Sequence, residues 1–235
     1  IRREDMIAIS YGKIMSFIVA IDGPAGAGKG TITKLVGKKL NLINIDTGAT
    51  YRCVTLAAIQ NGYTLENEEK IVGLLDKIKI EFKKVKEQDR IILNDVDVTD
   101  QIRSAEVNNM VSQVSHIPEV RNKMADFQRK IAEGKNVIME GRDIGTNVFP
   151  NANVKIYLDA TAEERAKRRV LQNKEKGIEI SYQEVLENIK FRDNNDKTSK
   201  VAPLKMAEDA IYVDSTDLNI NEVVEKIVEI IKNNI

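Results

Sequence analysis

The chain has 235 residues, and its 36 lysines and arginines balance its 36 aspartates and glutamates. A formal net charge of zero gives no general attraction to nucleic acid or to a membrane surface, so any attraction for anions must be local. Cys53 is the only cysteine, which excludes an intrachain disulfide framework and a Cys-x-x-Cys metal site and suits a reducing compartment. No apolar run approaches the roughly 20 residues that cross a bilayer. We therefore expect a soluble, intracellular protein.

The chain length suits one domain that carries an inserted subdomain. Residues 1–14 have little pattern and are interpreted as a tag remnant or an upstream extension, so that the domain covers 15–235. Short apolar runs rich in Val and Ile then alternate with helical patterns, of which Thr31 to Leu40 and Glu163 to Lys176 are examples. The expected strands are Phe17 to Asp22, Leu42 to Asp46, Asn136 to Gly141, Val154 to Asp159 and Ala210 to Ser215.

Near-continuous hydrophobicity indicates strands covered on both faces, and hence an α/β fold with a parallel sheet between helices. One segment, Gly62 to Ser104, departs from this alternation of strands and helices because it is highly charged. It contains IKIEFKKV and RIILNDVDV, and the second stretch alternates as a hairpin strand does. We expect a small α+β insertion at about 62–104 in a core formed by 15–61 and 105–235.

The motif GPAGAGKGT directly follows the first expected strand. A strand, Gly-x-x-x-x-Gly-Lys and a helix form a phosphate-binding loop, because glycines let backbone N–H groups surround an anion and the helix directs its positive end at the same spot. Lys29 is expected to reach the β and γ phosphates of a nucleoside triphosphate. Gly30 stands where Ser or Thr is usual, and the shift to Thr31 turns the hydroxyl about 100° around the helix, which leaves direct magnesium ligation by Thr31 open. The predicted ATP-binding residues are Gly23, Pro24, Ala25, Gly26, Ala27, Gly28, Lys29, Gly30 and Thr31.

Further motifs follow the other expected strands: DTGATYR at 46–52, EGRDIGT at 140–146 and DAT at 159–161. Ligands of open parallel sheets bind beyond the carboxyl ends of the strands. Arg52 and Arg142 are therefore expected one or two residues past a strand, facing the loop across one crevice. Either arginine alone could form a surface ion pair, but two guanidinium forks beside the loop indicate a second phosphate-bearing substrate besides ATP.

These motifs, together with RDNNDKTSKVAPL and AEDAIYVDST, resemble those of the bacterial cytidylate kinases, and the similarity runs from about Met15 to the C-terminus. Members of that family transfer the γ-phosphate of ATP to CMP or dCMP. The resemblance implies the three-layer P-loop nucleoside monophosphate kinase fold, with 62–104 as a monophosphate-binding insertion and a helical lid at about 165–180. It also implies Mg²⁺ carried by ATP, with no metal ligand supplied by the protein unless Thr31 is one.

The resemblance assigns the CMP phosphate to Arg52 and Arg142, and cytosine to an arginine and a carboxylate. A carboxylate can accept from the exocyclic amine while an arginine donates to the ring acceptors. Uracil lacks that amine and leaves the carboxylate without its partner, at a cost of a few kcal/mol. By matching motif positions, cytosine is assigned to Ser112, Arg121 and Asp143, the sugar to Thr47 and Asp196 with help from Arg192, and catalysis to Lys29, Arg142, Arg168 and Arg169.

The expected mechanism needs no general base, because a nucleotide phosphate with a second pKa of about 6 is already largely dianionic near pH 7. His116, the only histidine, is interpreted as a surface or capping residue. The reaction needs two phosphates to be aligned and water to be excluded. Arg168 and Arg169 are therefore expected to fold onto the ATP phosphates, although on sequence alone this segment reads as a solvated helix face with Glu163–Lys167 and Glu164–Arg168 pairs.

One position departs from the family pattern, and it predicts weaker CMP binding. Ser199 stands where an arginine usually helps to hold phosphate, and Lys197 or Lys200 would supply only a point charge in its place.

Other classes of protein share a phosphate loop. A GTP-binding switch would need an Asn-Lys-x-Asp motif, which the sequence lacks. A nonenzymatic nucleotide-binding module would have no use for Arg52, Arg142 and Asp143 together. A kinase of AMP or UMP is the nearest alternative, since only the base pocket differs. The expected partners are ATP and CMP or dCMP, with no nucleic acid and no membrane, and we expect a cytoplasmic monomer.

Overall fold

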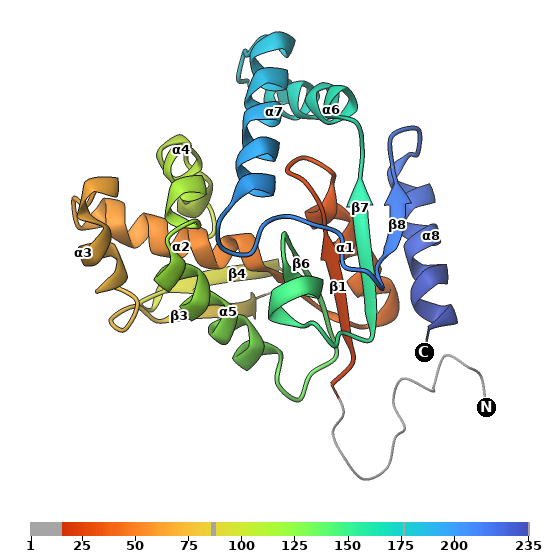
Figure 1. Ribbon diagram of the computed structural model, residues 1–235, viewed down its shortest axis with the longest axis horizontal. Helices are drawn as coiled ribbons and strands as arrows, with labels where there is room; N and C mark the ends of the chain where they lie inside the picture. The colour runs from red at the N-terminus through yellow and green to blue at the C-terminus, as the bar shows by residue number, and fades with distance from the viewer. Residues whose placement is uncertain (1–15, 86–87, 176, 235) are drawn as a thin grey trace.

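The computed structural model describes residues 16–85, 88–175 and 177–234 (Figure 1). The predicted tag or extension at 1–14 lies outside the described residues. Five parallel strands form the central sheet in the order β2-β6-β1-β7-β8. They are β1 (Ile18–Asp22), β2 (Ile43–Asp46), β6 (Val137–Gly141), β7 (Val154–Asp159) and β8 (Ile211–Asp214). Each differs from its predicted range by at most one residue at either end.

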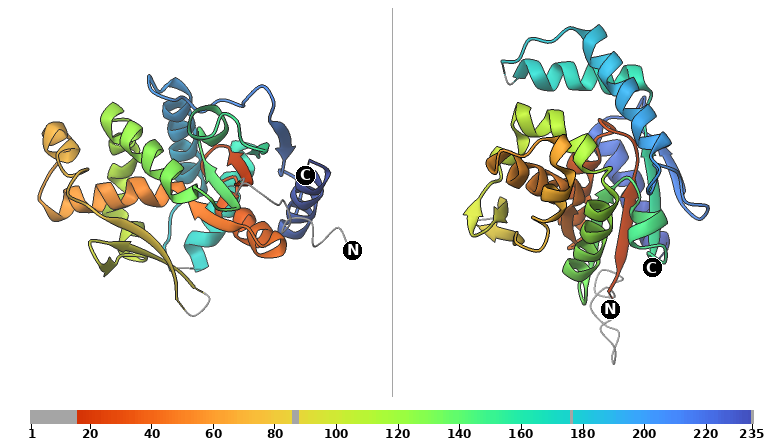
Figure 2. Two further views of the ribbon diagram at one scale, coloured as in Figure 1. Left: turned by 90° about the horizontal axis from the view of Figure 1, so that it is seen from below. Right: turned by 60° about the vertical axis from the view of Figure 1, so that its left-hand side comes forward.

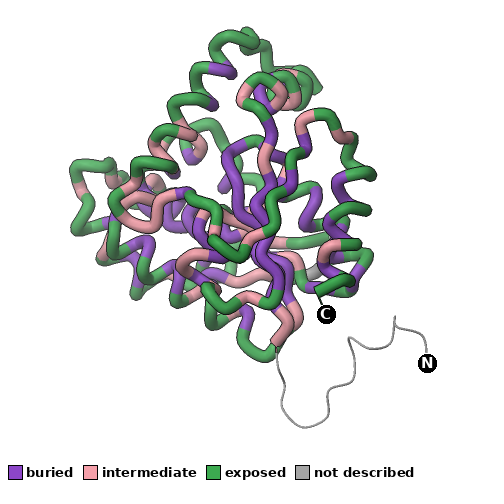
Figure 3. The backbone as a smooth tube through the Cα atoms, turned by 45° about the vertical axis from the view of Figure 1, so that its right-hand side comes forward, coloured by how far each residue is buried: buried purple, intermediate pink, exposed green. Residues whose placement is uncertain are grey.

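Helices cover both faces of this sheet, as predicted. On one face, Val19 and Ile21 pack with α1 (Lys29–Leu40) and α8 (Ile220–Asn233). On the other face, Ile18 and Ala20 pack with α5 (Pro118–Ala132) and η4 (Ile144–Val148). Successive side chains of β1 therefore point to opposite helical layers, and buried residues fill the middle of the molecule (Figure 3). The three-layer α/β architecture is confirmed.

The charged segment at 62–104 folds into short helices and a three-stranded antiparallel sheet. The helical elements are η2 (Leu65–Asn67), α3 (Glu68–Val72) and η3 (Gln101–Arg103), and the strands are β3 (Ile80–Val85), β4 (Gln88–Leu93) and β5 (Val96–Asp97). Residues 86–87 are not described. This α+β unit lies on the opposite side of the molecule from α8 (Figures 1 and 2).

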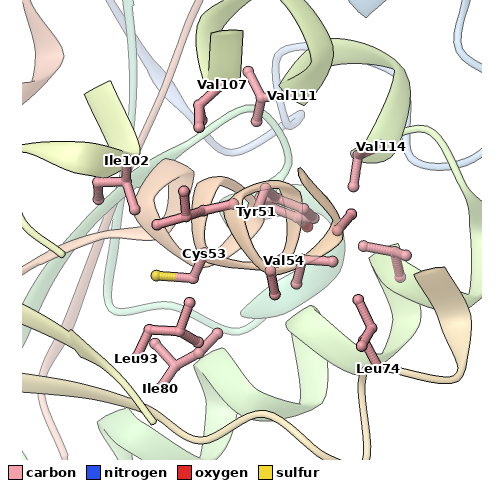
Figure 4. Packing of buried hydrophobic residues seen from close by; sticks show 14 of the residues in the cluster. Tyr51, Cys53, Val54, Leu74, Ile80, Leu93, Ile102, Val107, Val111 and Val114 are labelled. Atoms are coloured by element: carbon pink, nitrogen blue, oxygen red, sulfur yellow. The ribbon is translucent and has the colours of Figure 1, made fainter. Parts of the chain in front are cut away.

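A second hydrophobic core joins this α+β unit to α2 (Thr47–Gln60), α4 (Ala105–Val114) and α5. Cys53 and Val54 lie in its centre, with Ile80 and Leu93 on the small sheet and Val107 on α4 (Figure 4). Burial raises the pKa of the Cys53 thiol to about 12, so the single cysteine acts as a packing residue.

Two further helices, α6 (Ala162–Glu175) and α7 (Tyr182–Thr198), lie beyond the carboxyl ends of the strands (Figures 1 and 2). They pack on one another through a small core of Ala166, Val185, Leu186 and Ile189. The helix predicted at 163–176 matches α6, and the two helices together extend past the predicted lid range of 165–180. No helix in the described part of the chain is both long and apolar enough to cross a bilayer.

Two local predictions are wrong. Arg52 does not lie just past a strand, because Asp46 caps α2 by accepting from the Ala49 N–H at 3.2 Å and the chain is already helical from Thr47. Glu163 binds Lys190 on α7 at 3.2 Å, and Lys167 lies near Glu164 instead. The Glu164–Arg168 pair is present, with Arg168 Nε 3.2 Å from the carboxylate.

Candidate active site

The phosphate loop lies between β1 and α1, and three of its glycines have positive φ angles. Gly26 and Gly28 have φ of 82° and 85°, which side chains other than glycine rarely adopt. Gly23 also passes against β7, where an added Cβ would lie 2.0 Å from the Leu158 carbonyl oxygen. The loop therefore needs glycine for its turns and for its packing on the sheet.

Lys29 begins α1 and its side chain turns back over this loop. Its Nζ donates to the carbonyl oxygens of Gly23 and Pro24, both at 2.7 Å. Burial, and then the positive charge of Arg142, lower the pKa of Lys29 to about 7, while Glu140 and Asp22 oppose the shift. Lys29 and Arg142 thus lie close enough to repel one another, as two cations facing a common anion would.

Glu140 is the penultimate residue of β6 and lies beside the first turn of α1. Its Oε1 lies 2.9 Å from where a Cβ on Gly30 would be, so the carboxylate approaches the position that carries Ser or Thr in the usual loop. Burial and the neighbouring Asp46 raise the pKa of Glu140 to about 7. Thr31 is exposed on the same turn of the helix. The described residues contain no group of three or more His, Cys, Asp or Glu side chains that could hold a metal ion by themselves.

Arg142 follows β6 and binds Asp196 on α7, with Nε 2.8 Å from the carboxylate. Burial alone would lower the pKa of Arg142, but Asp196 and Glu140 leave it above its usual range. The structure thus joins two residues predicted for the CMP phosphate and sugar in one ion pair. This pair lies beside Lys29.

Arg121 and Asp143 form a buried ion pair, 2.8 Å from Nη2 to Oδ1, with side chains 7% and 5% exposed. Arg121 also donates to the carbonyl oxygens of Ser115 and Ala202. Ser112 lies one helical turn before Ser115, whose hydroxyl donates to the Ser112 carbonyl at 2.8 Å. Arg121 and Asp143 therefore meet directly, although they come from α5 and the turn after β6. Ser112 on α4 is linked to them through Ser115.

Arg52 lies on α2 and is held by the segment that follows the small sheet. Its Nη1 donates to Asn108 Oδ1 at 2.7 Å and to the Ile102 carbonyl at 3.1 Å. Burial lowers the pKa of Arg52 to about 10, and Arg103, Arg192 and Arg169 act in the same direction against Asp46. Burial and then Arg142 likewise lower the pKa of Arg192.

Arg52, Arg142 and Arg169, which were predicted to bind phosphate, thus form a basic cluster with Arg192, which was predicted to assist at the sugar. Bound phosphate would relieve the mutual repulsion of these four arginines.

Two predicted residues make other contacts in this conformation. Thr47 is buried and its hydroxyl donates to the Glu140 carbonyl at 2.6 Å. Arg168 donates from Nη2 to the Ser215 carbonyl at 2.6 Å, at the end of β8. Their assignments to the sugar and to the ATP phosphates remain predictions.

His116 and Ser199 flank the predicted CMP residues. The ring nitrogens of His116 face the carbonyl oxygens of Ser112 and Asn195, so this half-buried side chain joins the end of α4 to α7. Ser199 follows α7, and its hydroxyl donates to the Val201 carbonyl at 2.8 Å. Lys197 and Lys200 are both exposed.

Arg165, to which no role was assigned from the sequence, contacts the phosphate loop. Its side chain is 5% exposed and binds Asp193 of α7 through both terminal nitrogens, at 3.0 and 2.6 Å. It also donates to the Ala25 carbonyl of the phosphate loop at 2.9 Å. The only sign of these contacts in the sequence is the run of charged residues in α6, which is equally typical of a solvent-exposed helix face.

Comparison with known proteins agrees with this geometry. The family model described as Cytidylate kinase matches residues 19–233. The chain belongs to the cytidylate kinase family. The cytidylate kinase of Caldicellulosiruptor bescii is 50% identical over 212 residues, which cover 90% of this chain and 94% of that protein. The cytidylate kinase of Bacillus subtilis is 46% identical over 214 residues, 91% of this chain and 96% of that protein.

A solved structure of an uncharacterized protein from Eubacterium ventriosum has a TM-score of 0.51 and 12% identity, and the match covers 93% of this chain and 99% of that chain. At this identity the likeness concerns the fold alone. Membership of the cytidylate kinase family, and not this likeness, indicates which chemistry the basic cluster supports.

Proposed function

We propose that this member of the cytidylate kinase family transfers the γ-phosphate of ATP to CMP or dCMP, giving ADP and CDP or dCDP. The observation that carries the proposal is the position of Arg142 and Asp143. Arg142 lies beside Lys29 of the phosphate loop and binds Asp196, while the adjacent Asp143 binds Arg121 in a buried pair. One short turn therefore links a phosphate-binding cation to a base-reading carboxylate.

The buried pair suits cytosine. Asp143 can accept from the exocyclic amine, and cytosine supplies acceptors at N3 and O2. Arg121 Nε is a buried donor without a hydrogen-bond partner among the described residues, which is costly unless a ligand supplies the acceptor. Uracil would present a carbonyl to the carboxylate, so the pair favours CMP over UMP.

Transfer itself requires alignment and charge neutralisation. Lys29 and the loop amides would hold the ATP phosphates, and Arg52 and Arg142 the acceptor phosphate. We assign the sugar to Thr47 and Asp196 with Arg192. The basic cluster would then stabilise the charge on the transferring group in place of water.

Magnesium belongs to the proposal as the ion that ATP carries. When bound, it would neutralise negative charge on the phosphate oxygens. Hard oxygen ligands suit it, and the Glu140 carboxylate beside Gly30 and the exposed Thr31 hydroxyl are the candidates on this chain. Asp22 does not fit this role, because both of its oxygens accept backbone N–H groups.

We further propose that the α6–α7 pair is the lid, with Arg168 and Arg169 closing on ATP, and that the α+β unit at 62–104 serves the monophosphate site. Arg169 is exposed on α6, and its charge acts on both Arg52 and Arg192. A cytoplasmic monomer is part of the same proposal.

The test is a panel of CMP, dCMP, UMP and AMP, each with ATP and Mg²⁺, followed by ADP release. We expect turnover with CMP and dCMP and much lower kcat/KM with UMP and AMP. Turnover of AMP or UMP above that of CMP would replace the substrate assignment. ATP binding without turnover of any acceptor would favour a binding module.

A further inference from the structure

The turn that carries Arg142 and Asp143 is anchored by a residue of another strand. Asp22, the last residue of β1, accepts from the Ile144 N–H through Oδ1 at 2.8 Å and from the Gly145 N–H through Oδ2 at 2.7 Å. Asp22 is 5% exposed. Both oxygens of this buried carboxylate thus accept hydrogen bonds from the backbone that directly follows Arg142 and Asp143, the two residues proposed to bind CMP.

The sheet explains why this contact forms. Asp22 lies opposite Gly141 of β6 in the parallel register, and its side chain points to the face covered by η4. Gly145 is closely packed here, because an added Cβ would lie 3.1 Å from Lys155 Cδ and, at 3.4 Å, in ordinary van der Waals contact with Asp22 Oδ2. Burial raises the pKa of Asp22 to about 6, and the two N–H groups oppose that shift. The two N–H groups thus stabilise the charged form of Asp22 against the cost of its burial.

A second side chain holds the carboxylate of Asp143 itself. Asn147 Nδ2 donates to Asp143 Oδ2 at 2.8 Å, while Oδ1 receives Arg121. Arg129 on α5 in turn donates to the carbonyl oxygens of Asn147 and Val148, both at 2.9 Å. The turn is therefore held at the Asp143 carboxylate, at the two N–H groups that follow it and at the carbonyl groups of Asn147 and Val148.

We propose that Asp22 and Asn147 are positioning residues of the CMP site. Asp22 fixes the backbone that presents both Arg142 and Asp143, and Asn147 fixes the orientation of the Asp143 carboxylate. The inference depends on the proposed function, since it assumes that these two residues read CMP. Preorganised groups bind without having to be ordered by the ligand. Loss of the Asp22 or the Asn147 side chain should therefore weaken nucleotide binding at the CMP site more than ATP binding.

The test measures Kd for CMP, UMP and a nonhydrolysable ATP analogue by titration calorimetry and competition. Asp22→Asn leaves one N–H group facing an amide NH₂, and should raise Kd for both CMP and UMP about tenfold, which corresponds to one lost charged hydrogen bond. Its Kd for the ATP analogue should change less than its Kd for CMP, because Asp22 acts on Lys29 through charge only but binds the backbone of the CMP turn directly. Asn147→Leu removes the donor to Asp143 alone, and should raise Kd for CMP about fivefold while Kd for UMP stays the same.

Asn153→Ala is the matched control. Asn153 Oδ1 accepts from the Ile18 N–H at 2.8 Å, at the opposite end of the same strand as Asp22, so its loss should lower the Tm without altering Kd for any nucleotide. Wild-type Kd for CMP in Asp22→Asn and Asn147→Leu would overturn the inference. An equal loss of affinity for CMP, UMP and the ATP analogue, in proportion to the decrease in Tm, would also overturn it.

Should Asp22→Asn not fold, Asp22→Glu takes its place, because it keeps the charge while its extra methylene group moves the carboxylate relative to the Ile144 and Gly145 N–H groups. Failure of the wild-type protein to bind CMP would contradict the proposed function itself. If the wild-type protein binds CMP and the variants bind it equally well, only the positioning roles of Asp22 and Asn147 are contradicted.

Discussion

Arg121 on α5 and Asp143 after β6 form an ion pair of 2.8 Å from which solvent is almost excluded. Asp143→Asn would leave the Arg121 guanidinium buried without its counter-charge, which costs about 3 kcal/mol of folding free energy. The same change removes the negative charge that the cytosine amine would meet and replaces one acceptor oxygen by an NH₂ donor, so we expect kcat/KM for CMP to fall towards that for UMP.

Urea unfolding and steady-state kinetics measure the two effects of Asp143→Asn. The double variant Arg121→Met, Asp143→Asn is the control, since it removes the uncompensated charge and should regain part of the stability but none of the CMP preference. Undiminished preference for CMP over UMP in Asp143→Asn would contradict the proposed reading of the base.

Lys29 should take up a proton when ATP binds. Its pKa of about 7 makes the free amine mostly neutral at pH 8, whereas bound phosphates stabilise the charged form. ATP affinity should therefore decrease as the pH rises above 7. Titration calorimetry at pH 8 in two buffers of different ionisation enthalpy measures the uptake. Lys29→Arg, which keeps its charge at this pH, should bind without it, and equal uptake by both proteins would show another group to be responsible.

Arg168→Ala should lower kcat for phosphoryl transfer about a hundredfold, in the range of lost transition-state charge stabilisation, with little effect on Kd for CMP. In this conformation Arg168 binds the end of β8, so closure of the lid would have to release it. Lys167→Ala, which changes an exposed cation on the same helix, is the control. Equal losses of transfer and of CMP binding in Arg168→Ala would count against the lid.

Ser199→Arg should strengthen CMP binding about fivefold, because a guanidinium adds a charged hydrogen bond to phosphate. Ser199 binds only the nearby Val201 carbonyl in the described structure, so the substitution disturbs no distant contact. Thr198→Arg adds the same charge at an exposed position of α7 and serves as the control. An unchanged Kd for CMP, measured by calorimetry, would mean that Ser199 does not weaken CMP binding relative to arginine.

Gly23→Ala should destabilise the protein far more than Gly28→Ala. Both positions have positive φ, which costs about 1 kcal/mol for alanine, but only the Cβ at Gly23 would collide with β7, at 2.0 Å from the Leu158 carbonyl. Overpacking of this kind adds about 1–3 kcal/mol. Thermal and urea unfolding compare the two variants, and equal stabilities would show that the loop can move off the strand.

The strands and the phosphate loop could be predicted because their signals are local. Five apolar runs and the spacing of glycines and Lys29 depend on neighbouring residues only. Helix α2 was missed for a local reason too. Most of its side chains are buried, among them Ala49, Cys53, Val54 and Leu56, so it lacks the polar face that makes a surface helix recognisable. That omission placed Arg52 at a strand end instead of on a helix.

The contacts that assemble the site were decided by tertiary structure. Asp22 meets Ile144 across 122 positions of the chain, and Arg165 meets Ala25 across 140. The sequence determined by itself which residue types are available at each strand end and, through the resemblance, the family. It could not determine which charge pairs with which, because burial and partner geometry set those energies and both exist only once the helices have packed on the sheet.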